Sequence, residues 1–405
     1  MAIVPGSIRR GLAALVIGLL AVSAAAKQPA GTGWTKITPA AIAVGADGKP
    51  HAPTCSGYPG TNATFSFWTK TGTSKNLAVF FEGGGACWDK LTCTFPISNP
   101  LPPGLPPNLQ FFVPAVDGTT DPANFNGIFK ADNPANPIKD WSIVYIPYCT
   151  GDLHVGSATK RYQNAGNPYI PAEFDIQHRG FDNFMVVLDW MKKNIDKPKN
   201  VLVTGPSAGG YGASANFPWI ERTFRNAHTY VLADASQGVT APAFDTFGRT
   251  SWNMQLAPWV YGNDPTAIAG PDLLRVATAA HPRVKVAQFT TTYDDVQILF
   301  YGVMKQLYQY PGLSLDTAID WNLQMIDTLQ SYAADLPNFR YYLAEGTYHT
   351  LLRSPQFYLE NSAGIPFSEW LTGMLANRGG TGGHGGNWYN ASCAGCLTPP
   401  SLARR

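Results

Sequence analysis

Short apolar runs, rich in β-branched and aromatic residues, recur along the chain, and each has the length of a buried strand. Strands that are continuously apolar are typical of a parallel sheet that is covered on both faces. We therefore expect strands at Leu77–Phe81, Ser142–Pro147, Asn200–Thr204, Thr229–Ala233, Val284–Thr292 and Phe339–Ala344.

Helical patterns lie between several of these runs. The clearest spans Phe181 to Ile195, where apolar residues recur at helical spacing and Lys192 and Lys193 occupy another face. Its apolar face consists of Phe184, Val187, Leu188, Met191 and Ile195. Buried strands that alternate with amphipathic helices predict an α/β-hydrolase-like α/β fold, with a mostly parallel sheet and helices on both faces.

Long segments interrupt this alternation. The stretch 99–136 is rich in Pro, Asn and Gly, which predicts a long ordered loop or cap. Residues 235–283 and 295–336 are long excursions between strands, where we expect lid elements over one edge of the sheet.

The N-terminus has the parts of a secretory signal peptide. Arg9 and Arg10 form a positive region, Gly11–Val22 is apolar, and Ala24–Ala26 offers small residues for cleavage. The sequence therefore predicts a signal peptide over 1–26 and a secreted or periplasmic protein. We expect no stable membrane insertion, with an uncleaved anchor as the alternative.

The remaining length and composition suit a secreted enzyme. We expect one domain over 27–377, with two domains as the alternative, and a Gly-rich C-terminal tail over 378–405. No internal repeat is visible. Charged residues make up 14% of the chain, against 33 Pro and 12% aromatic residues. The net charge of +2 is spread without a basic block, so nucleic acid is not an expected partner.

The chain contains an even number of cysteines: Cys55, Cys87, Cys93, Cys149, Cys393 and Cys396. Behind a signal peptide this predicts up to three disulfides, whose pairing the sequence leaves open. Cys87 with Cys93, and Cys393 with Cys396, are close enough to close local loops. A single Cys-x-x-Cys without a second pair is a poor match to a zinc site, so no metal is expected.

The most informative motif is Gly205-Pro206-Ser207-Ala208-Gly209, which follows an apolar run and precedes small residues where a helix can begin. This is the Gly-x-Ser-x-Gly nucleophile elbow, a tight turn that lifts a serine above the carboxyl edge of a parallel sheet. We expect glycine at both flanking positions because a Cβ there would clash with neighbouring backbone. Ser207 is therefore the candidate nucleophile, and an ordinary turn serine is the alternative.

An α/β-hydrolase needs an acid and then a histidine after its serine. Asp294 follows the expected strand 284–292 and His349 follows the strand 339–344, so both would emerge at the same sheet edge as Ser207. His349 is the expected general base, and Asp294 is expected to orient it. Asp295 is the alternative acid, and the alternative for His349 is a structural role in its loop.

Two further residues compete for these roles. His154 is the rival imidazole, but it precedes the serine, which is the wrong order for this fold. Asp234 ends the strand after the elbow, and we expect it to support the pocket rather than act in the triad.

A run of three glycines, Gly83–Gly85, follows the strand that ends near Phe81. Catalysis of acyl transfer needs backbone N–H groups aimed at the developing oxyanion, and glycine lets a loop approach closely. We expect the amides of Gly84, Gly85 and Ala208 to form the oxyanion hole. A plain flexible turn is the alternative for the glycines.

Together these segments resemble the pectin acetylesterase family, which also contains the Notum carboxylesterases. Glu82–Trp88 looks like the family's Glu-Gly-Gly-Gly-Trp-Cys segment, and Tyr148–Asp152 looks like its Tyr-Cys-x-Gly block. Gly205–Gly210 looks like the family's elbow. Tyr293–Ile298 is similar to its Tyr-Asp-x-x-Gln-Ile motif, which favours Asp294 over Asp295 as the acid.

The sequence also departs from the family pattern. Ala86 stands where the plant-type pattern has an aromatic residue, and Tyr348–Thr350 lacks the family's cysteine beside the histidine. Ala233–Ser236 differs from the family's Asp-Ser-Gly. These changes leave the triad intact but put the substrate pocket in doubt.

The resemblance implies ester hydrolysis that needs no metal or cofactor. With the elbow and the signal peptide, we therefore expect a secreted serine carboxylesterase. By family analogy its partner is an ester substrate, with an acetyl group on a polysaccharide as the first expectation. The alternatives are hydrolysis of lipid-like or polyester acyl esters, which needs a deep apolar pocket, and a catalytically inactive carbohydrate-binding or cell-surface protein. Trp88, Tyr148 and Trp219 are candidates to line the acyl or sugar site, with burial in the core as the alternative.

Overall fold

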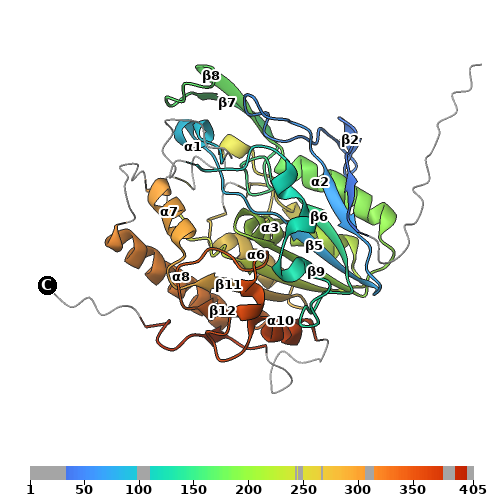
Figure 1. The fold of residues 1–405 in the computed structure, drawn as a ribbon, viewed down its shortest axis with the longest axis vertical. Helices are drawn as coiled ribbons and strands as arrows, with labels where there is room; N and C mark the ends of the chain where they lie inside the picture. Colours follow the sequence, from blue (N-terminus) through green and yellow to red (C-terminus); the bar gives the residue numbers. More distant parts are fainter. Residues whose placement is uncertain are drawn as a thin grey trace, which may run out of the picture.

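A nine-stranded sheet forms the centre of the molecule (Figure 1). The computed structural model describes residues 33–97, 110–241, 244, 250–265, 268–305, 314–376 and 388–398. The strand order is β1-β4-β6-β5-β9-β10-β11-β12-β13. The strands are β1 (Thr35–Ile37), β4 (Phe67–Lys70), β5 (Asn76–Phe81), β6 (Ser142–Ile146), β9 (Asn200–Pro206), β10 (His228–Asp234), β11 (Lys285–Thr291), β12 (Phe339–Ala344) and β13 (Ala391–Ser392).

The sheet is mostly parallel, as the apolar runs predict. All neighbours from β6 to β13 pair in parallel, whereas β4 is antiparallel to both β6 and β1. The six expected strands correspond to β5, β6, β9, β10, β11 and β12. Their side chains are buried on both faces, which explains why they are continuously apolar.

Helices surround the sheet and form most of the connections between its strands. They are α1 (Lys90–Thr94), α2 (Gly180–Asn194), α3 (Ala208–Thr223), α5 (Pro258–Tyr261), α6 (Asp272–Ala280), α7 (Asp295–Met304), α8 (Leu315–Asp335), α9 (Gln356–Leu359) and α10 (Phe367–Leu375). The expected helix at 181–195 is α2, and its predicted face is buried from Phe184 to Met191, while Lys192 and Lys193 are exposed.

Both faces of the sheet are covered by other parts of the chain. Two adjacent residues of β5, whose side chains point to opposite faces, show this. Phe81 of β5 contacts Phe184 of α2, with ring centroids 5.4 Å apart. Phe80, which points to the opposite face, contacts Phe129 at 4.7 Å. Phe129 belongs to one of three short 3-10 helices, η1 (Gly118–Thr120), η2 (Pro122–Asn124) and η3 (Gly127–Phe129).

The same holds at the other end of the sheet. Phe339 of β12 packs against Tyr332 of α8, and Tyr342 packs against Trp370 of α10. Residues three apart in a strand point to opposite faces, so α8 and α10 lie on different sides. The expected layered α/β architecture is therefore confirmed.

The long insertions contain structure at the expected places. Residues 110–136 of the Pro-rich stretch contain the three 3-10 helices, while 98–109 lie outside the described residues. The excursion 235–283 contains α5 and α6, and the excursion 295–336 contains α7 and α8.

The short and edge strands are absent from the sequence-based expectation. They include two antiparallel pairs outside the main sheet, β2 (Ala43–Val44) with β3 (Pro50–His51) and β7 (Ala158–Gln163) with β8 (Glu173–His178). Such strands are polar on one face or too short to form an apolar run, so a search for continuous apolar segments misses them.

The chain termini are only partly described. The expected signal peptide and the glycine-rich stretch 378–386 lie outside the described residues. Within the expected tail, Ala391–Ser392 forms β13 and pairs with β12. Among the helices of the described part, none combines the length and apolarity that a bilayer crossing requires.

All six cysteines form disulfides. The two local loops are closed by Cys87–Cys93 and Cys393–Cys396. The third bond joins Cys55 to Cys149 across 94 positions of sequence. It links the segment before β4 to the segment after β6, a pairing that the sequence leaves open.

Candidate active site

Ser207 lies directly between β9 and α3, at the carboxyl edge of the sheet. Its backbone has φ 55° and ψ −126°, a left-handed conformation that is strained for a residue with a side chain. A Cβ on Gly205 or Gly209 would lie 2.2 or 2.0 Å from the carbonyl oxygen of Phe81. The elbow is therefore pressed against the end of β5, which explains the two flanking glycines.

The glycine run lies against this elbow. A Cβ on Gly83 would lie 3.2 Å from the Cβ of Ser207, so the two segments are in contact. Gly84 and Gly85 have φ of 153° and 72°, and a Cβ on Gly85 would lie 1.9 Å from the carbonyl oxygen of Phe111. Glycine is required there by both conformation and space.

Some backbone N–H groups of the glycine run have hydrogen-bond acceptors and others do not. The N–H of Gly83 donates to the Glu82 side chain at 2.8 Å, and the N–H of Ala86 donates to the carbonyl of Phe111 at 2.8 Å. The N–H groups of Gly84 and Gly85 donate to no group among the described residues. The unpaired amides of the glycine run are thus those of Gly84 and Gly85, two of the three that the sequence predicts for an oxyanion hole. Ala208 lies beside Ser207 in the wall of the same cavity.

The structure brings His349 and Asp294 together. The Nδ1 of His349 lies 2.8 and 2.9 Å from the two carboxylate oxygens of Asp294. Asp294 is fully buried and caps α7, because its carboxylate accepts the backbone N–H of Gln297 at 2.9 Å. The side-chain amide of Gln297 donates to the same carboxylate at 3.1 Å. The acid is thereby fixed in position and faces the imidazole.

Burial and charge act on His349 in opposite directions. Burial lowers the pKa of His349, but the negative charges of Asp294, Asp234 and Asp295 raise the pKa above the ordinary histidine value. Such an imidazole is well suited to hold a proton while an intermediate forms.

Ser207 and His349 line one cavity, at the same edge of the sheet. The Nε2 of His349 is buried and has no hydrogen-bond partner among the described residues. It is therefore not hydrogen-bonded to Ser207 in this structure. Catalytic hydrogen bonds are commonly long in the absence of substrate and tighten when it binds.

The rival residues lie elsewhere. Asp295 is exposed, and its N–H donates to the carbonyl of Thr347 at 3.0 Å. His154 is buried, and its Nε2 lies 2.8 Å from the backbone carbonyl of Glu82. Burial lowers the pKa of His154 to about 4, so this imidazole is neutral and supports the strand end beneath the glycine run.

Two buried carboxylates beside the triad residues have contacts that the sequence does not reveal. Glu82 receives the Tyr145 hydroxyl at 2.8 Å and pairs with Arg353 at 2.9 Å. The Asp234 carboxylate receives the backbone N–H groups of Leu351 and Leu352. Both contacts reach the segment that follows His349. In the sequence, the only sign of either contact is a carboxylate residue at the end of an apolar strand.

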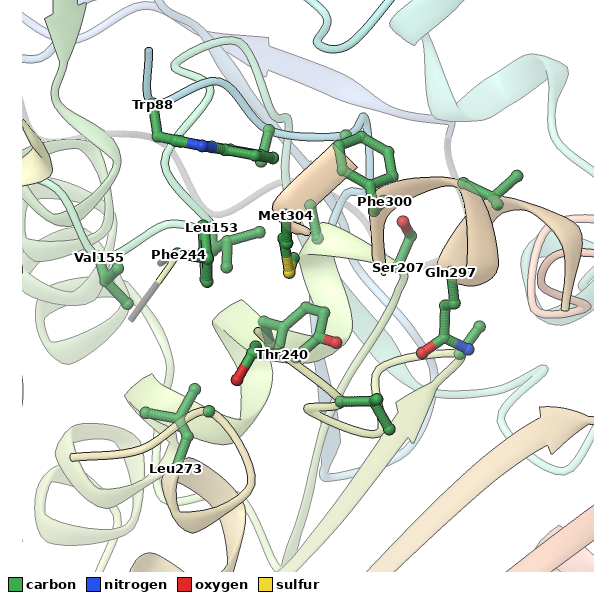
Figure 2. A pocket seen from close by; sticks show the side chains of 18 of the residues that line it. Trp88, Leu153, Val155, Ser207, Thr240, Phe244, Leu273, Gln297, Phe300 and Met304 are labelled. Carbon is green, nitrogen blue, oxygen red and sulfur yellow. The ribbon is translucent and has the colours of Figure 1, made fainter. Parts of the chain in front are cut away.

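The cavity beside Ser207 is apolar and comprises about 950 Å³ of space between atoms, its open mouth included. Figure 2 shows its side chains, with Phe300 near Ser207, Met304 projecting toward the centre, and Trp88 forming one wall. Other apolar side chains in its wall are Leu153, Val155, Phe244, Trp252 and Leu273.

Only Trp88 among the three candidate aromatic residues lines this cavity. Tyr148 is buried, and its hydroxyl accepts the N–H of Leu153 at 3.0 Å. Trp219 packs against Trp259 with ring centroids 4.5 Å apart and borders a different hollow.

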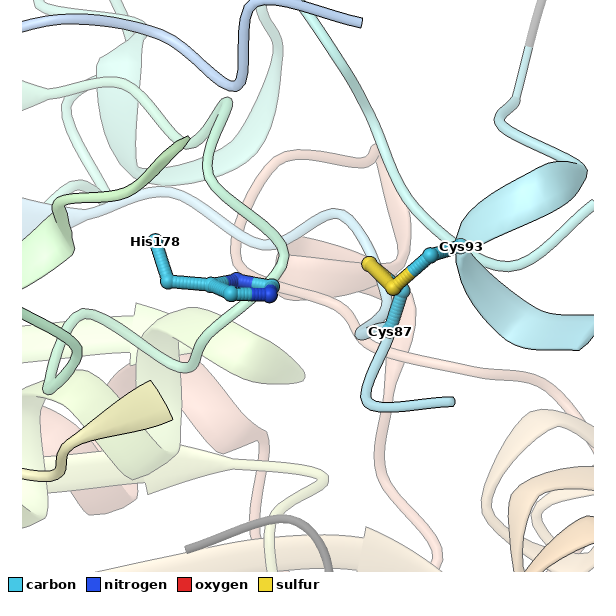
Figure 3. A group of neighbouring side chains, drawn as sticks. All are labelled: Cys87, Cys93 and His178. Carbon is cyan, nitrogen blue, oxygen red and sulfur yellow. A yellow bond between two sulfur atoms is a disulfide. The ribbon is translucent and has the colours of Figure 1, made fainter. Parts of the chain in front are cut away.

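One cluster of metal-ligating residue types occurs among the described residues, Cys87, Cys93 and His178 (Figure 3). The two sulfurs are joined as a disulfide. The Nδ1 of His178 lies 2.9 Å from the carbonyl of Thr150, and its Nε2 lies 2.9 Å from the hydroxyl of Tyr162. Since no thiolate or free imidazole nitrogen remains, the cluster in this state does not offer a metal site.

Comparison with known proteins covers the part of the chain that contains the elbow. The family model described as Pectinacetylesterase matches residues 52–253, a range that contains Ser207 and the glycine run but neither Asp294 nor His349. Palmitoleoyl-protein carboxylesterase notum2 of Xenopus laevis is 26% identical over 164 residues, which cover 39% of this chain and 28% of that protein. Palmitoleoyl-protein carboxylesterase NOTUM of Schmidtea mediterranea is 24% identical over 182 residues, 43% of this chain and 31% of that protein. The matched region thus spans less than a third of either relative.

Proposed function

The chain belongs to the pectinacetylesterase family, and from this premise we propose that it is a serine carboxylesterase with Ser207, His349 and Asp294 as its catalytic triad. The observation that carries the proposal is the hydrogen bond between His349 and the buried Asp294, together with the place of His349 in the same cavity wall as the strained Ser207.

In the first half of the reaction, Ser207 Oγ attacks the carbonyl carbon of the ester and transfers its proton to Nε2 of His349. Asp294 stays ionised, holds Nδ1–H and stabilises the imidazolium. The tetrahedral intermediate then collapses, its bond to the alcohol oxygen breaks, and His349 gives the proton to the departing alcohol.

In the second half, water attacks the acyl-enzyme while His349 removes the water proton. Collapse releases the carboxylic acid and returns the proton to Ser207. In both halves the amides of Gly84, Gly85 and Ala208 stabilise the oxyanion. Losing one such donor costs about 3 kcal/mol of transition-state stabilisation in enzymes of this kind.

The cavity bears on the acyl group. An acetyl group has a single methyl to bury, whereas the wall beside Ser207 is apolar over many side chains, including Trp88, Phe300 and Met304. Burial of each further methylene contributes about 0.8 kcal/mol. We propose that the cavity receives an acyl chain longer than acetate, which favours the lipid-like or polyester substrates over an acetylated polysaccharide.

We further propose that the protein is exported, with residues 1–26 as its signal peptide. The support is the apolar N-terminal sequence and the three disulfides, which form and persist in oxidising compartments. N-terminal sequencing of the secreted protein tests the cleavage site.

The direct test compares wild type with Ser207→Ala on chromogenic acetate, butyrate and octanoate esters. We expect wild type to show the highest kcat/KM on the longer chains and Ser207→Ala to lose about 10⁶-fold in kcat with an unchanged melting temperature. Retained activity in the variant would remove Ser207 from the mechanism. Inactivity of the folded wild type on every ester would favour the inactive binding protein instead, and a preference for acetate would favour the deacetylase.

A further inference from the structure

Asp234 connects two segments of the site that are distant in sequence. It is the last residue of β10, paired in register with Pro206 at the end of β9, and its side chain is fully buried. Its backbone carbonyl accepts the N–H of Ser207 at 2.7 Å. The nucleophile elbow is therefore tied by its own amide to the end of the neighbouring strand.

The side chain of Asp234 holds the segment that carries the histidine. One carboxylate oxygen, Oδ2, accepts the N–H of Leu351 at 2.9 Å and the N–H of Leu352 at 3.0 Å. A single residue thus hydrogen-bonds the nucleophile turn through its main chain and the histidine segment through its side chain.

The histidine segment needs such support. Thr350, between His349 and the two bonded amides, has φ 70°. A β-branched residue is disfavoured in this left-handed region, so the turn persists only where surrounding contacts fix it. The bonds of His349 to Asp294 hold the turn on one side of Thr350, and the two amides at Asp234 hold it on the other.

The negative charge of the Asp234 carboxylate also acts on the imidazole of His349. The charged groups that face His349 are Asp294 and Asp295 at the start of α7 and Asp234 at the end of β10. The second oxygen of Asp234, Oδ1, is buried without a hydrogen-bond partner among the described residues. Burial raises the pKa of Asp234 to about 7, while the amides of Leu352 and Leu351 and the charge of His349 oppose this.

From this geometry we infer that Asp234 is a positioning residue of the reaction, which sets the location of His349 relative to Ser207 and adds negative charge beside the imidazole. The inference rests on the proposed triad. Asp234 does not contact substrate; it acts through the backbone of residues 351 and 352 and through its charge.

Two substitutions separate these contributions. Asp234→Ala removes the acceptor and the charge, whereas Asp234→Asn keeps an oxygen that can accept both amides and removes only the charge. On a chromogenic octanoate ester we expect Asp234→Ala to lose about 100-fold in kcat with little change in KM, because the base is displaced. Asp234→Asn should recover much of this loss.

The pH dependence of kcat/KM distinguishes an electrostatic effect of Asp234 on His349 from a purely structural role, because a structural role would leave the acidic limb unchanged. His349 acts as a base only when neutral, so kcat/KM falls as the pH drops through its pKa. Removing the nearby negative charge in Asp234→Asn should shift this acidic limb to lower pH. As a matched control, Asp182→Asn changes another buried aspartate, which is bonded to His51, and should leave the limb in place.

All assays are run well below the melting temperature of each variant, with Ser207→Ala in parallel. A wild-type kcat in Asp234→Ala, or a wild-type acidic limb in Asp234→Asn, overturns the inference; if Asp234→Ala does not fold, Asp234→Asn alone decides. Activity retained in Ser207→Ala would instead overturn the proposed triad.

Discussion

At the scale of single residues, the site depends on backbone conformations that most side chains avoid. Ser207, the proposed nucleophile, and Thr350, which directly follows the proposed base His349, both have positive φ. The N–H of Ser207 donates to the backbone carbonyl of Asp234. The N–H of Leu351, the residue after Thr350, donates to the Asp234 carboxylate. Local strain at both positions is thus maintained by contacts that are distant in sequence.

Asp294 is the residue whose substitution separates orientation from folding. It accepts the imidazole Nδ1–H and two hydrogen bonds from Gln297, so Asp294→Asn keeps the shape but favours the wrong tautomer of His349. We expect kcat to fall about 10⁴-fold, as in other serine triads.

The wild-type pH profile complements this variant. Since the carboxylates raise the pKa of His349, the acidic fall of kcat/KM should begin above the ordinary histidine range, and activity should be present above that pKa and lost below it. Full activity in Asp294→Asn, or an acidic limb below the ordinary range in wild type, would refute the assigned pair.

At the scale of elements, α7 serves both the triad and the cavity. Its N-terminal cap is Asp294, and Val296, Phe300 and Met304 follow at intervals of one helical turn and line the cavity. One helix therefore fixes the acid at its start and forms a wall of the proposed acyl site along its length.

This arrangement predicts a change of chain-length preference by substitution in α7. Met304→Trp should fill part of the cavity and lower kcat/KM on octanoate by about tenfold or more, while acetate hydrolysis stays within about threefold. Each lost methylene contact costs about 0.8 kcal/mol, so the loss of two such contacts already gives about tenfold. Leu323→Trp on α8 is the matched control, since Leu323 is 39% exposed and does not line the cavity. Equal losses on both esters in Met304→Trp would argue that the acyl chain binds elsewhere.

At the scale of the whole molecule, the central sheet could be predicted because its inner strands are buried on both faces. The runs that became β5, β9 and β12 are apolar for that reason. The turn chemistry at Gly205 and Gly209 also reveals the elbow, since close backbone approach demands glycine there. Both signals are local, because each depends only on residues that are consecutive in the sequence.

Contacts between distant segments leave no such local signal. The Cys55–Cys149 bond, the Glu82–Arg353 pair and the reach of Asp234 to Leu351 depend on how strands are ordered in space. The cavity wall likewise combines the glycine run, the excursion after β10 and α7, which only the folded chain brings together. Edge strands such as β13, two residues long, are too short to form a pattern.

The role of Ser207 as the nucleophile is tested most sharply by capture of the acyl-enzyme. Wild-type protein is mixed with a chromogenic octanoate ester, quenched in acid within the first turnovers and analysed by intact and peptide mass spectrometry. We expect an octanoyl adduct on the peptide that contains Ser207, and no such adduct in Ser207→Ala. Rapid hydrolysis with no adduct, or with the adduct on a different residue, would contradict it.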